Sequence, residues 1–334
     1  MNKYRTLLKN SSVLFFLLLA ILSGCEKGPA PLKLPEIISS GIFTLGSNSV
    51  TIKTTFNVES EDTVTNTGIC WSLHPDPEIY TNFTSASLND GIMYARIEGL
   101  APDTRYYARV FTGNPEREFY GDEITFTTNT TITDIEGNLY NVVTIGSQNW
   151  MVENLRTTVY NDGSGIPYAG SNTDWTVFDT PGYSWYDYNI ENKYLFGALY
   201  NWPVVNSGKL CPDGWHIPFD SEWSVLSDYL GGESSAGGFL KSTGHHWDSP
   251  NNNATNYAGF YGLPAGGPGA ALGSFTGKGS FTIWWSSTVD LSLGSGDGLI
   301  MTRILLSENA GLKRDGFMAR GGAINFLSVR CIKD

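Results

Sequence analysis

The sequence predicts a multidomain chain in which an all-β sandwich precedes a larger α+β domain. Two observations support this prediction. From residue 37 to about residue 128, short β-prone runs alternate with turn residues and show no helical periodicity. From about residue 132 the composition changes, because nine of the ten tryptophans and most of the glycines follow this point, together with two segments of helical spacing.

The first residues predict export and lipid attachment. Three basic residues are followed by an apolar run over residues 13–22, which is typical of a secretion signal and too short to span a membrane. The run ends in Leu22-Ser23-Gly24-Cys25, which resembles the lipobox of bacterial lipoproteins. The resemblance implies that residues 1–24 are removed and that Cys25 is lipidated. We therefore expect a protein of the bacterial cell envelope, anchored by lipid to a membrane, at the outer membrane and exposed at the surface.

The segment after the signal predicts a tether, and the overall charge argues against a nucleic-acid partner. Residues 25–36 contain three prolines and predict an extended tether. Removal of residues 1–24 takes away three positive charges and no negative ones, so the net charge moves from -12 to about -15. Nucleic acid is not expected as a partner, because phosphate binding requires clustered Lys and Arg.

The strands of the first domain are predicted from period-two alternation, which is clearest over residues 49–54. Further β-prone runs cover residues 67–71, 93–97, 105–111 and 124–128. The segment Gly99-Leu100-Ala101-Pro102-Asp103-Thr104-Arg105-Tyr106 resembles the fibronectin type III signature, so residues 37–128 are expected to form that kind of sandwich. Tyr106 is then expected to bond back to the main chain, and Cys70 to be a buried small residue. The default role of such a domain is a stalk.

The second domain, residues 132–334, is predicted to have little regular structure. Residues 134–140 indicate a hairpin with a Gly-Asn turn. Residues 194–202 indicate a helix stopped by Pro203, and residues 221–230 indicate a helix capped by Asp220 and stopped by two glycines. In the second helix, Trp223, Leu226 and Leu230 share one face, which should point into the core.

Four stretches of this domain together resemble the Fibrobacter succinogenes major paralogous domain, a family of bacterial surface and secreted proteins. They are residues 145–156 (IGSQNWMVENLR), 211–218 (CPDGWHIP), 284–288 (WWSST) and 328–331 (SVRC). The second stretch, with Glu222-Trp223, is also similar to C-type-lectin-like and formylglycine-generating folds. The resemblance implies a C-type-lectin-like α+β domain. The chain departs from the family at Phe219, where a capping threonine is usual, and over residues 262–269, a stretch that lacks the tyrosine-arginine pair often found in the family.

Three cysteines remain after Cys25, at positions 70, 211 and 331, so one thiol is left over or pairs outside the chain. An exported protein is in a compartment where disulfides persist. The family resemblance implies that Cys211 and Cys331 are bonded. Closing so long a loop would contribute about 4–5 kcal/mol on a chain-entropy basis.

Catalytic signatures are lacking in the sequence. It has no Gly-x-Ser-x-Gly elbow and no His-Glu-x-x-His motif. Residues 273–279 resemble a phosphate loop, but the spacing is one residue short and Gly279 replaces the magnesium-binding hydroxyl, so a flexible loop is expected. The cysteine pair that the formylglycine-generating resemblance would require is expected to be structural. We therefore expect a protein that is not an enzyme and has no cofactor.

A polar loop is the candidate ligand site. Its residues are His245, His246, Trp247, Asp248, Asn251 and Asn252. Trp247 lies in polar surroundings and is the best candidate to stack on a sugar ring, while the neighbouring side chains would bond its hydroxyl groups. Asp and Asn oxygens suit calcium, but adjacent histidines seldom share an ion, and no metal site is predicted. The alternative interpretation is an Asx-rich turn, which the sequence favours over a cation-binding loop.

The leading functional hypothesis is a surface-tethered recognition or adhesion protein whose lectin-like head binds a glycan or another surface ligand. One alternative is a structural component of the cell envelope that binds protein. A third hypothesis is an enzyme acting on an envelope substrate. Fold resemblance does not by itself decide among them.

Overall fold

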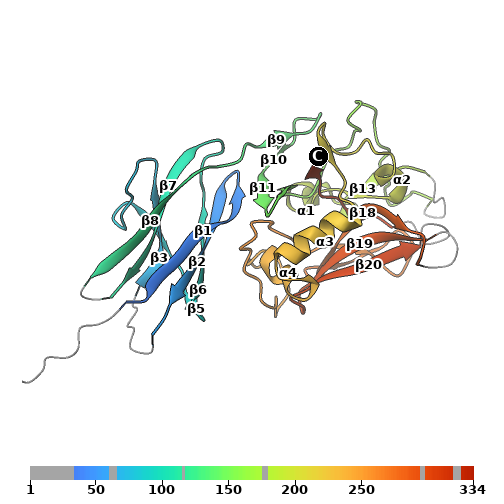
Figure 1. Cartoon of the computed structure of the whole chain (residues 1–334). Coiled ribbons are helices and arrows are strands. Elements are labelled where there is room, and N and C mark those ends of the chain that lie inside the picture. Colours follow the sequence, from blue (N-terminus) through green and yellow to red (C-terminus); the bar gives the residue numbers. More distant parts are fainter. Residues whose placement is uncertain (1–33, 60–65, 115–116, 175–179, 294–297, 319–324) are drawn as a thin grey trace, which may run out of the picture.

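The computed structural model describes residues 34–59, 66–114, 117–174, 180–293, 298–318 and 325–334. Figure 1 shows an N-terminal sandwich of blue and green strands beside a larger second domain, called the head here, which contains the longer helices and the orange and red strands. Strands and loops make up most of the described chain, and the helices are short. The predicted signal segment, Cys25 and most of the tether lie outside the described residues. Within the described part, no helix is long and apolar enough to cross a membrane.

The sandwich is built from two antiparallel sheets. In one sheet the order is β1-β2-β6-β5, and in the other it is β4-β3-β7-β8. The strands are β1 (Glu36–Gly46), β2 (Ser49–Asn57), β3 (Asn66–Ser72), β4 (Asn82–Ser85), β5 (Leu88–Asn89), β6 (Ile92–Glu98), β7 (Arg105–Gly113) and β8 (Glu118–Thr127).

Alternating side chains explain why these segments form strands. In β6, Met93, Ala95 and Ile97 are buried while their neighbours are exposed or half-buried, so one face of the strand lies in the core between the sheets. The other predicted runs coincide with β2, β3, β7 and the end of β8. The hydroxyl of Tyr106 accepts a hydrogen bond of 3.0 Å from the backbone N–H of Ala101, which confirms the predicted bond back to the main chain. Cys70 is buried and unpaired, as expected.

In its described residues, the head combines short strands with four short α-helices. In chain order its elements are β9 (Ile132–Thr133), β10 (Leu139–Tyr140), β11 (Val142–Ile145), β12 (Gln148–Met151), β13 (Tyr183–Ser184), the 3-10 turns η1 (Tyr186–Tyr188) and η2 (Ile190–Asn192), α1 (Lys193–Phe196), β14 (Leu199–Tyr200), α2 (Trp202–Val205), β15 (Trp215–His216), α3 (Asp220–Tyr229), α4 (Glu233–Leu240), β16 (Ala265–Pro268), β17 (Phe275–Lys278), β18 (Phe281–Asp290), β19 (Leu299–Leu306), β20 (Leu312–Met318), β21 (Leu327–Ser328) and β22 (Ile332–Lys333). The predicted hairpin is present as β9 and β10.

One predicted helix is present and the other is wrong. Helix α3 matches the prediction, but Phe219 and not Asp220 is its N-cap, and only the Glu222 half of a capping box remains, with its carboxylate accepting from the Phe219 N–H at 2.7 Å. Residues 194–202 do not form one helix. Helix α1 ends at Gly197, whose φ is +78°, and a short strand follows. Pro203 then lies in the first turn of α2, where a missing N–H is tolerated.

Two further expectations concern the loops. Residues 273–279 are not simply a flexible loop, because 275–278 form β17, which pairs with β16. The disulfide between Cys211 and Cys331 is present, with the Cα atoms 6.0 Å apart. It joins the loop before β15 to the segment that leads into β22, and both cysteines are buried in one apolar cluster of the head.

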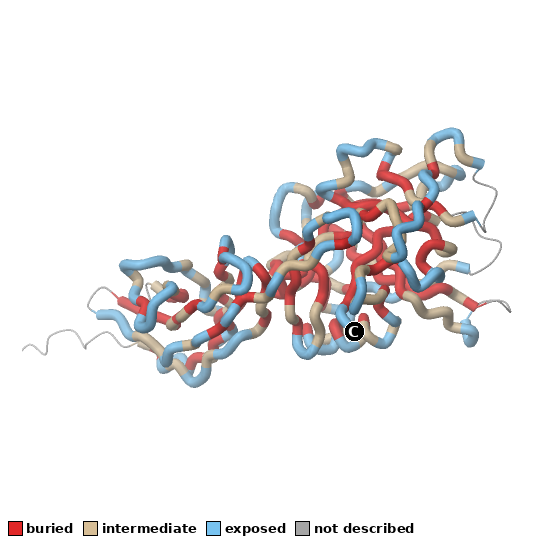
Figure 2. Tube along the Cα trace, turned by 90° about the horizontal axis from the view of Figure 1, so that it is seen from above, coloured by how far each residue is buried: buried red, intermediate tan, exposed pale blue. Residues whose placement is uncertain are grey.

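Tryptophans fill a second apolar cluster of the head. Trp150, Trp223 and Trp284 are fully buried and pack around Phe260, with neighbouring ring centroids 4.7–6.1 Å apart. Such rings bury large apolar areas, which compensates for the small amount of regular structure. Figure 2 shows buried backbone running through the head and into the sandwich.

The two domains share one continuous sheet. The eight-stranded order β15-β22-β12-β11-β1-β2-β6-β5 crosses the boundary where β1 pairs with β11, placing Thr44 opposite Ile145 and Gly46 opposite Val143. In Figure 1 the end of β1 lies directly beside β11. Asn129, in the connection between the domains, donates from its side-chain amide to the Leu45 carbonyl at 2.7 Å. The first domain is therefore joined to the head by main-chain hydrogen bonds as well as by the linker.

Aromatic side chains reinforce this junction. The ring of Phe43 on β1 lies 5.0 Å from Tyr94, 5.4 Å from Tyr229 and 5.8 Å from Phe239, between centroids. Tyr94 also stacks on Tyr257 at 5.1 Å. Since Tyr229, Phe239 and Tyr257 belong to the head, the cluster consists of rings from both domains. These contacts hold the two domains in one relative orientation.

Candidate functional site

The predicted sugar-stacking residue Trp247 is buried. Only 5% of its surface is exposed, and its ring belongs to the tryptophan-rich core of the head. Its indole N–H donates to the Gly262 carbonyl at 2.9 Å. A ring face packed in the core cannot stack on a ligand, so the expectation for Trp247 is wrong. Its polar neighbours along the chain had suggested exposure, but the loop folds so that this one side chain points inward.

Lys241 explains why the loop folds in this way. The side chain is fully buried, and its ammonium donates to the carbonyls of Leu306, Ser307 and Asn309 at 2.8–3.4 Å. The ammonium lies 5.6 Å from the centre of the Trp247 ring. Burial lowers the pKa of Lys241 to about 8. The ammonium of Lys241 thus satisfies three converging backbone carbonyls. No sequence motif pointed to this lysine.

The asparagines and the aspartate of the loop act mainly within the protein. Asn251 donates to the Ser242 carbonyl at 3.0 Å, and Asn252 donates to the Glu308 carbonyl at 2.6 Å. Asp248 accepts from the Ser280 hydroxyl at 2.6 Å. These bonds reach distant segments of the chain, so they anchor the loop to the rest of the head and are not the local bonds of an Asx turn.

His245 and His246 lie side by side near the surface. Their ring centroids are 4.6 Å apart, and burial together with the charge of His245 lowers the pKa of His246. Across the described ranges, no three His, Cys, Asp or Glu side chains are close enough to one another to hold a metal ion. The sequence-predicted residues therefore do not converge on one ligand, although His245 is exposed and directly follows Gly244, which lines the groove described next.

A groove of about 520 Å³ lies where the head meets the sandwich, next to the start of this loop. The sandwich contributes Trp71, Phe83 and Arg96, and the head contributes Thr243, Asn256 and Tyr261. The volume lies within the range of about 300–1,000 Å³ that is usual for small-molecule sites. We call this feature the waist groove. Sequence reasoning missed it because its two walls come from different domains.

Tyr261 occupies an unusual backbone conformation at the groove. Its φ is +53°, in the left-handed region that bulky residues rarely adopt, and 41% of its surface is exposed. Asn256, with a φ of +51°, supports this conformation by accepting the Tyr261 backbone N–H at 2.9 Å. Strained residues of this kind concentrate at binding sites.

Arg96 is the basic residue of the groove wall. Its guanidinium donates to Glu98 at 2.9 Å, to Ser49 at 2.8 Å and to Thr51 at 3.2 Å. Burial lowers its pKa, and the bond to Glu98 opposes that effect. Arg96 and Glu98 are the charged residues among the described ones that line the groove, so the lining carries no net charge.

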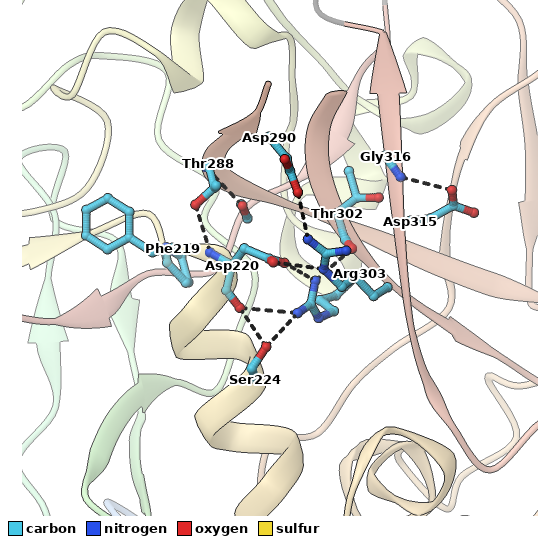
Figure 3. A network of polar contacts seen from close by, with 12 residues as sticks. Phe219, Asp220, Ser224, Thr288, Asp290, Thr302, Arg303, Asp315 and Gly316 are labelled. Carbon is cyan, nitrogen blue, oxygen red and sulfur yellow. Dashed lines mark hydrogen bonds and ion pairs between the residues drawn. The ribbon is translucent and has the colours of Figure 1, made fainter. Parts of the chain in front are cut away.

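A second polar cluster fastens α3 to the sheet (Figure 3). The fully buried Arg303 pairs with Asp220 and also donates to the Ser224 hydroxyl at 3.2 Å. Arg314 donates to the other Asp220 oxygen at 2.8 Å and to Asp290 at 3.3 Å. Both Asp220 oxygens are therefore engaged by arginines, which is why this residue does not cap its helix. The cluster holds the helix in place on the sheet.

His216 is the histidine most engaged with carboxylates. Its Nδ1 is 2.7 Å from Asp334 and its Nε2 is 2.9 Å from Glu222. Burial alone would lower the pKa of His216, but the bonds to the two carboxylates outweigh burial and raise it. Both ring nitrogens are occupied by acceptors, so neither is available to activate a nucleophile. Cys211 and Cys331 are bonded to each other and present no thiol.

Comparison with curated proteins finds no match. Among solved structures, the chain is similar to the chicken CNTN1 FN1–FN3 domains at 20% identity, covering 30% of this chain and 33% of that one, with a TM-score of 0.24. It is similar to the fn3 domain of human contactin 1 at 22% identity, covering 31% and 90%, with a TM-score of 0.23. A third similar structure is the sensor domain of the anti-sigma factor RsgI4 of Pseudobacteroides cellulosolvens, at 16% identity, covering 30% and 76%, with a TM-score of 0.21.

The family comparison concerns the head. The four motifs of the sequence analysis contribute its central features: Trp150 and Trp284 in the core, the bonded Cys211 and Cys331, and helix α3 after the second motif. A family model described as the Fibrobacter succinogenes major domain matches residues 143–333, which is more than half of the chain, and the chain therefore belongs to this family.

Proposed function

We propose that this chain is a lipid-anchored, non-catalytic recognition protein of the bacterial cell envelope, with a C-type-lectin-like head that binds a glycan. The observation that carries the proposal is the waist groove, which combines exposed rings with amide and hydroxyl groups. Rings provide apolar faces for sugar C–H groups, and the polar side chains provide partners for hydroxyl groups. The occupied nitrogens of His216 and the bonded cysteines support a binding role over a catalytic one.

A glycan array tests this function with the chain that begins at Glu26, which lacks the lipid attachment site. We expect saturable binding that is the same with calcium and with a chelator, because Lys241 already satisfies the carbonyls of the adjoining loop. Absence of binding by protein that is folded by circular dichroism would contradict the glycan function.

The anchor is tested separately. We propose that Cys25 carries lipid, on the evidence of the signal segment and the lipobox-like residues before it. Growth with a labelled fatty acid should label the wild type and not a Cys25→Ala variant. Labelling of the variant would contradict the proposed anchor.

A structural role that involves protein binding is the second candidate function. Exposed apolar side chains on the head favour it, since Ile190 is 63% exposed, Tyr194 is 77% exposed and Leu195 is 41% exposed. Concentration-dependent self-association that is lost in Leu195→Asp would support this role. A chain that stays monomeric at all concentrations would count against assembly with itself.

A further inference from the structure

We infer that the waist groove holds an uncharged oligosaccharide between the two domains, with Phe83 and Trp71 of the sandwich on one side and Tyr261 of the head on the other. This inference rests on the proposed glycan function and adds the site, the charge class of the ligand and the participation of the sandwich. It makes the first domain part of the binding unit.

The two walls are held rigidly, which a site between domains requires. Main-chain pairing of β1 with β11 crosses the boundary. Two side-chain bonds add to it: the Thr44 hydroxyl donates to the Tyr257 carbonyl at 3.0 Å, and the Tyr229 hydroxyl donates to the Phe43 carbonyl at 2.8 Å. A groove whose walls are fixed before binding loses less conformational entropy when the ligand enters.

The groove contains two exposed rings and one half-buried ring. Phe83 has 51% of its surface exposed and Tyr261 has 41%, while Trp71 is half-buried. Phe83 is also held edge-on against Phe111, at a centroid distance of 6.1 Å. Each domain therefore contributes at least one ring whose face can meet a sugar.

The backbone at Tyr261 gives independent support. A left-handed φ at a non-glycine residue costs about 1–3 kcal/mol and persists where the surrounding structure enforces it. Asn256 enforces it by accepting the Tyr261 N–H, and Asn256 itself lines the groove. The strain thus holds an aromatic ring and an amide at the same site.

The charges of the lining point to a neutral ligand. Arg96 is already paired with Glu98 at 2.9 Å, and these two are the charged residues among the described lining. An anionic ligand would have to compete with Glu98 for the guanidinium, and a cationic ligand would meet Arg96. Neutral sugars need only the rings and the hydrogen-bonding groups, so they fit the lining without breaking the ion pair.

The test uses calorimetry with the full mature chain and neutral hexasaccharides of β-linked glucose, xylose and mannose, with an oligogalacturonide as the anionic comparison. Tyr261→Gly removes the ring and relieves the strained φ, so folding should be retained while affinity for the bound neutral sugar falls by about tenfold or more. Phe83→Ala should cause a similar loss from the opposite wall. Tyr80→Ala removes an exposed ring that does not line the groove and should leave affinity unchanged.

Each outcome decides between the two proposals. Loss of affinity in both groove variants, with an unchanged control, supports the inference. Wild-type binding of a neutral glycan that survives both Tyr261→Gly and Phe83→Ala overturns the groove site while the glycan function stands. Preference for the oligogalacturonide overturns the neutral ligand class. Binding of none of these sugars by folded wild-type protein overturns the groove inference and the glycan function together.

Discussion

Loss of the disulfide should remove a large part of the stability of this protein. The bond joins Cys211 to Cys331 across 120 residues of sequence. In the chain-entropy model, closing a loop of that length stabilises the folded state by about 5 kcal/mol. Since natural domains have a total stability of about 5–15 kcal/mol, reduction should cost the head a third of its stability or more.

Because of where the disulfide lies in the fold, its loss should destabilise the whole head. Cys331 leads into β22, which lies between β15 and β12 in the shared sheet. Both cysteines belong to the larger apolar cluster of the head, so the cross-link connects the chain end to the core. For a domain of this size, a loss of about 5 kcal/mol corresponds to a fall in Tm of about 10–20 °C.

The assay is urea unfolding followed by tryptophan fluorescence, with oxidised and reduced wild type compared. Reduction should lower the urea midpoint strongly, and the double variant Cys211→Ala/Cys331→Ala should unfold early and show no response to reductant. Cys70→Ala is the control, because Cys70 is unpaired and the variant should respond to reductant as the wild type does. Identical midpoints for oxidised and reduced protein would refute the chain-entropy reasoning.

Three further predictions concern buried charges and the junction. Burial lowers the pKa of Lys241 to about 8, so the free energy of unfolding should rise between about pH 8 and pH 10.5. Urea titrations at several pH values should show this rise in the wild type and not in Lys241→Met. The same dependence of unfolding free energy on pH in both proteins would contradict the prediction. The pKa of His216 is raised in the folded protein, so its stabilising effect should be complete below pH 6.5 and lost as pH rises through that raised pKa. His216→Gln should remove this pH dependence of the unfolding free energy. An unchanged dependence in the variant would count against the ion pairs. Phe43→Ala should lower the free energy of unfolding by about 2 kcal/mol, because it removes a ring from the junction cluster. Calorimetry should show one transition for the joined domains of the wild type and two for the variant. A single unchanged transition in the variant would argue against coupling through the aromatic cluster.

Local sequence patterns were sufficient to predict several elements of the fold. Period-two alternation over residues 49–54 predicted β2, and β-prone runs between turn residues predicted β6 and β7. The resemblance of residues 99–106 to the fibronectin type III signature implied the bond made by Tyr106, and spacing predicted helix α3 with Trp223 inward. These features depend on neighbours within a few residues, which a single sequence displays directly.

The remaining features depend on contacts between distant segments. Trp247 is buried because the loop closes over Lys241 and the carbonyls near residue 307, about 60 residues away. Helical spacing over residues 194–202 is interrupted because Gly197 turns the chain toward β14, which pairs with β21 near the C-terminus. Pairing of Thr44 with Ile145 joins segments a hundred residues apart, and the waist groove exists only because of that pairing.

The shared sheet also determines how the protein would carry mechanical force. In the proposed anchored state, a pull between the membrane and a bound ligand enters the folded part at Glu36 and runs along β1 to its end at Gly46. There β1 is bonded sideways to β11, and antiparallel hydrogen bonds lie perpendicular to the strands, so they are loaded in shear and must break together. A tensile load would therefore pass from the anchor to the head through one strand, and the sandwich could resist rupture without first unravelling.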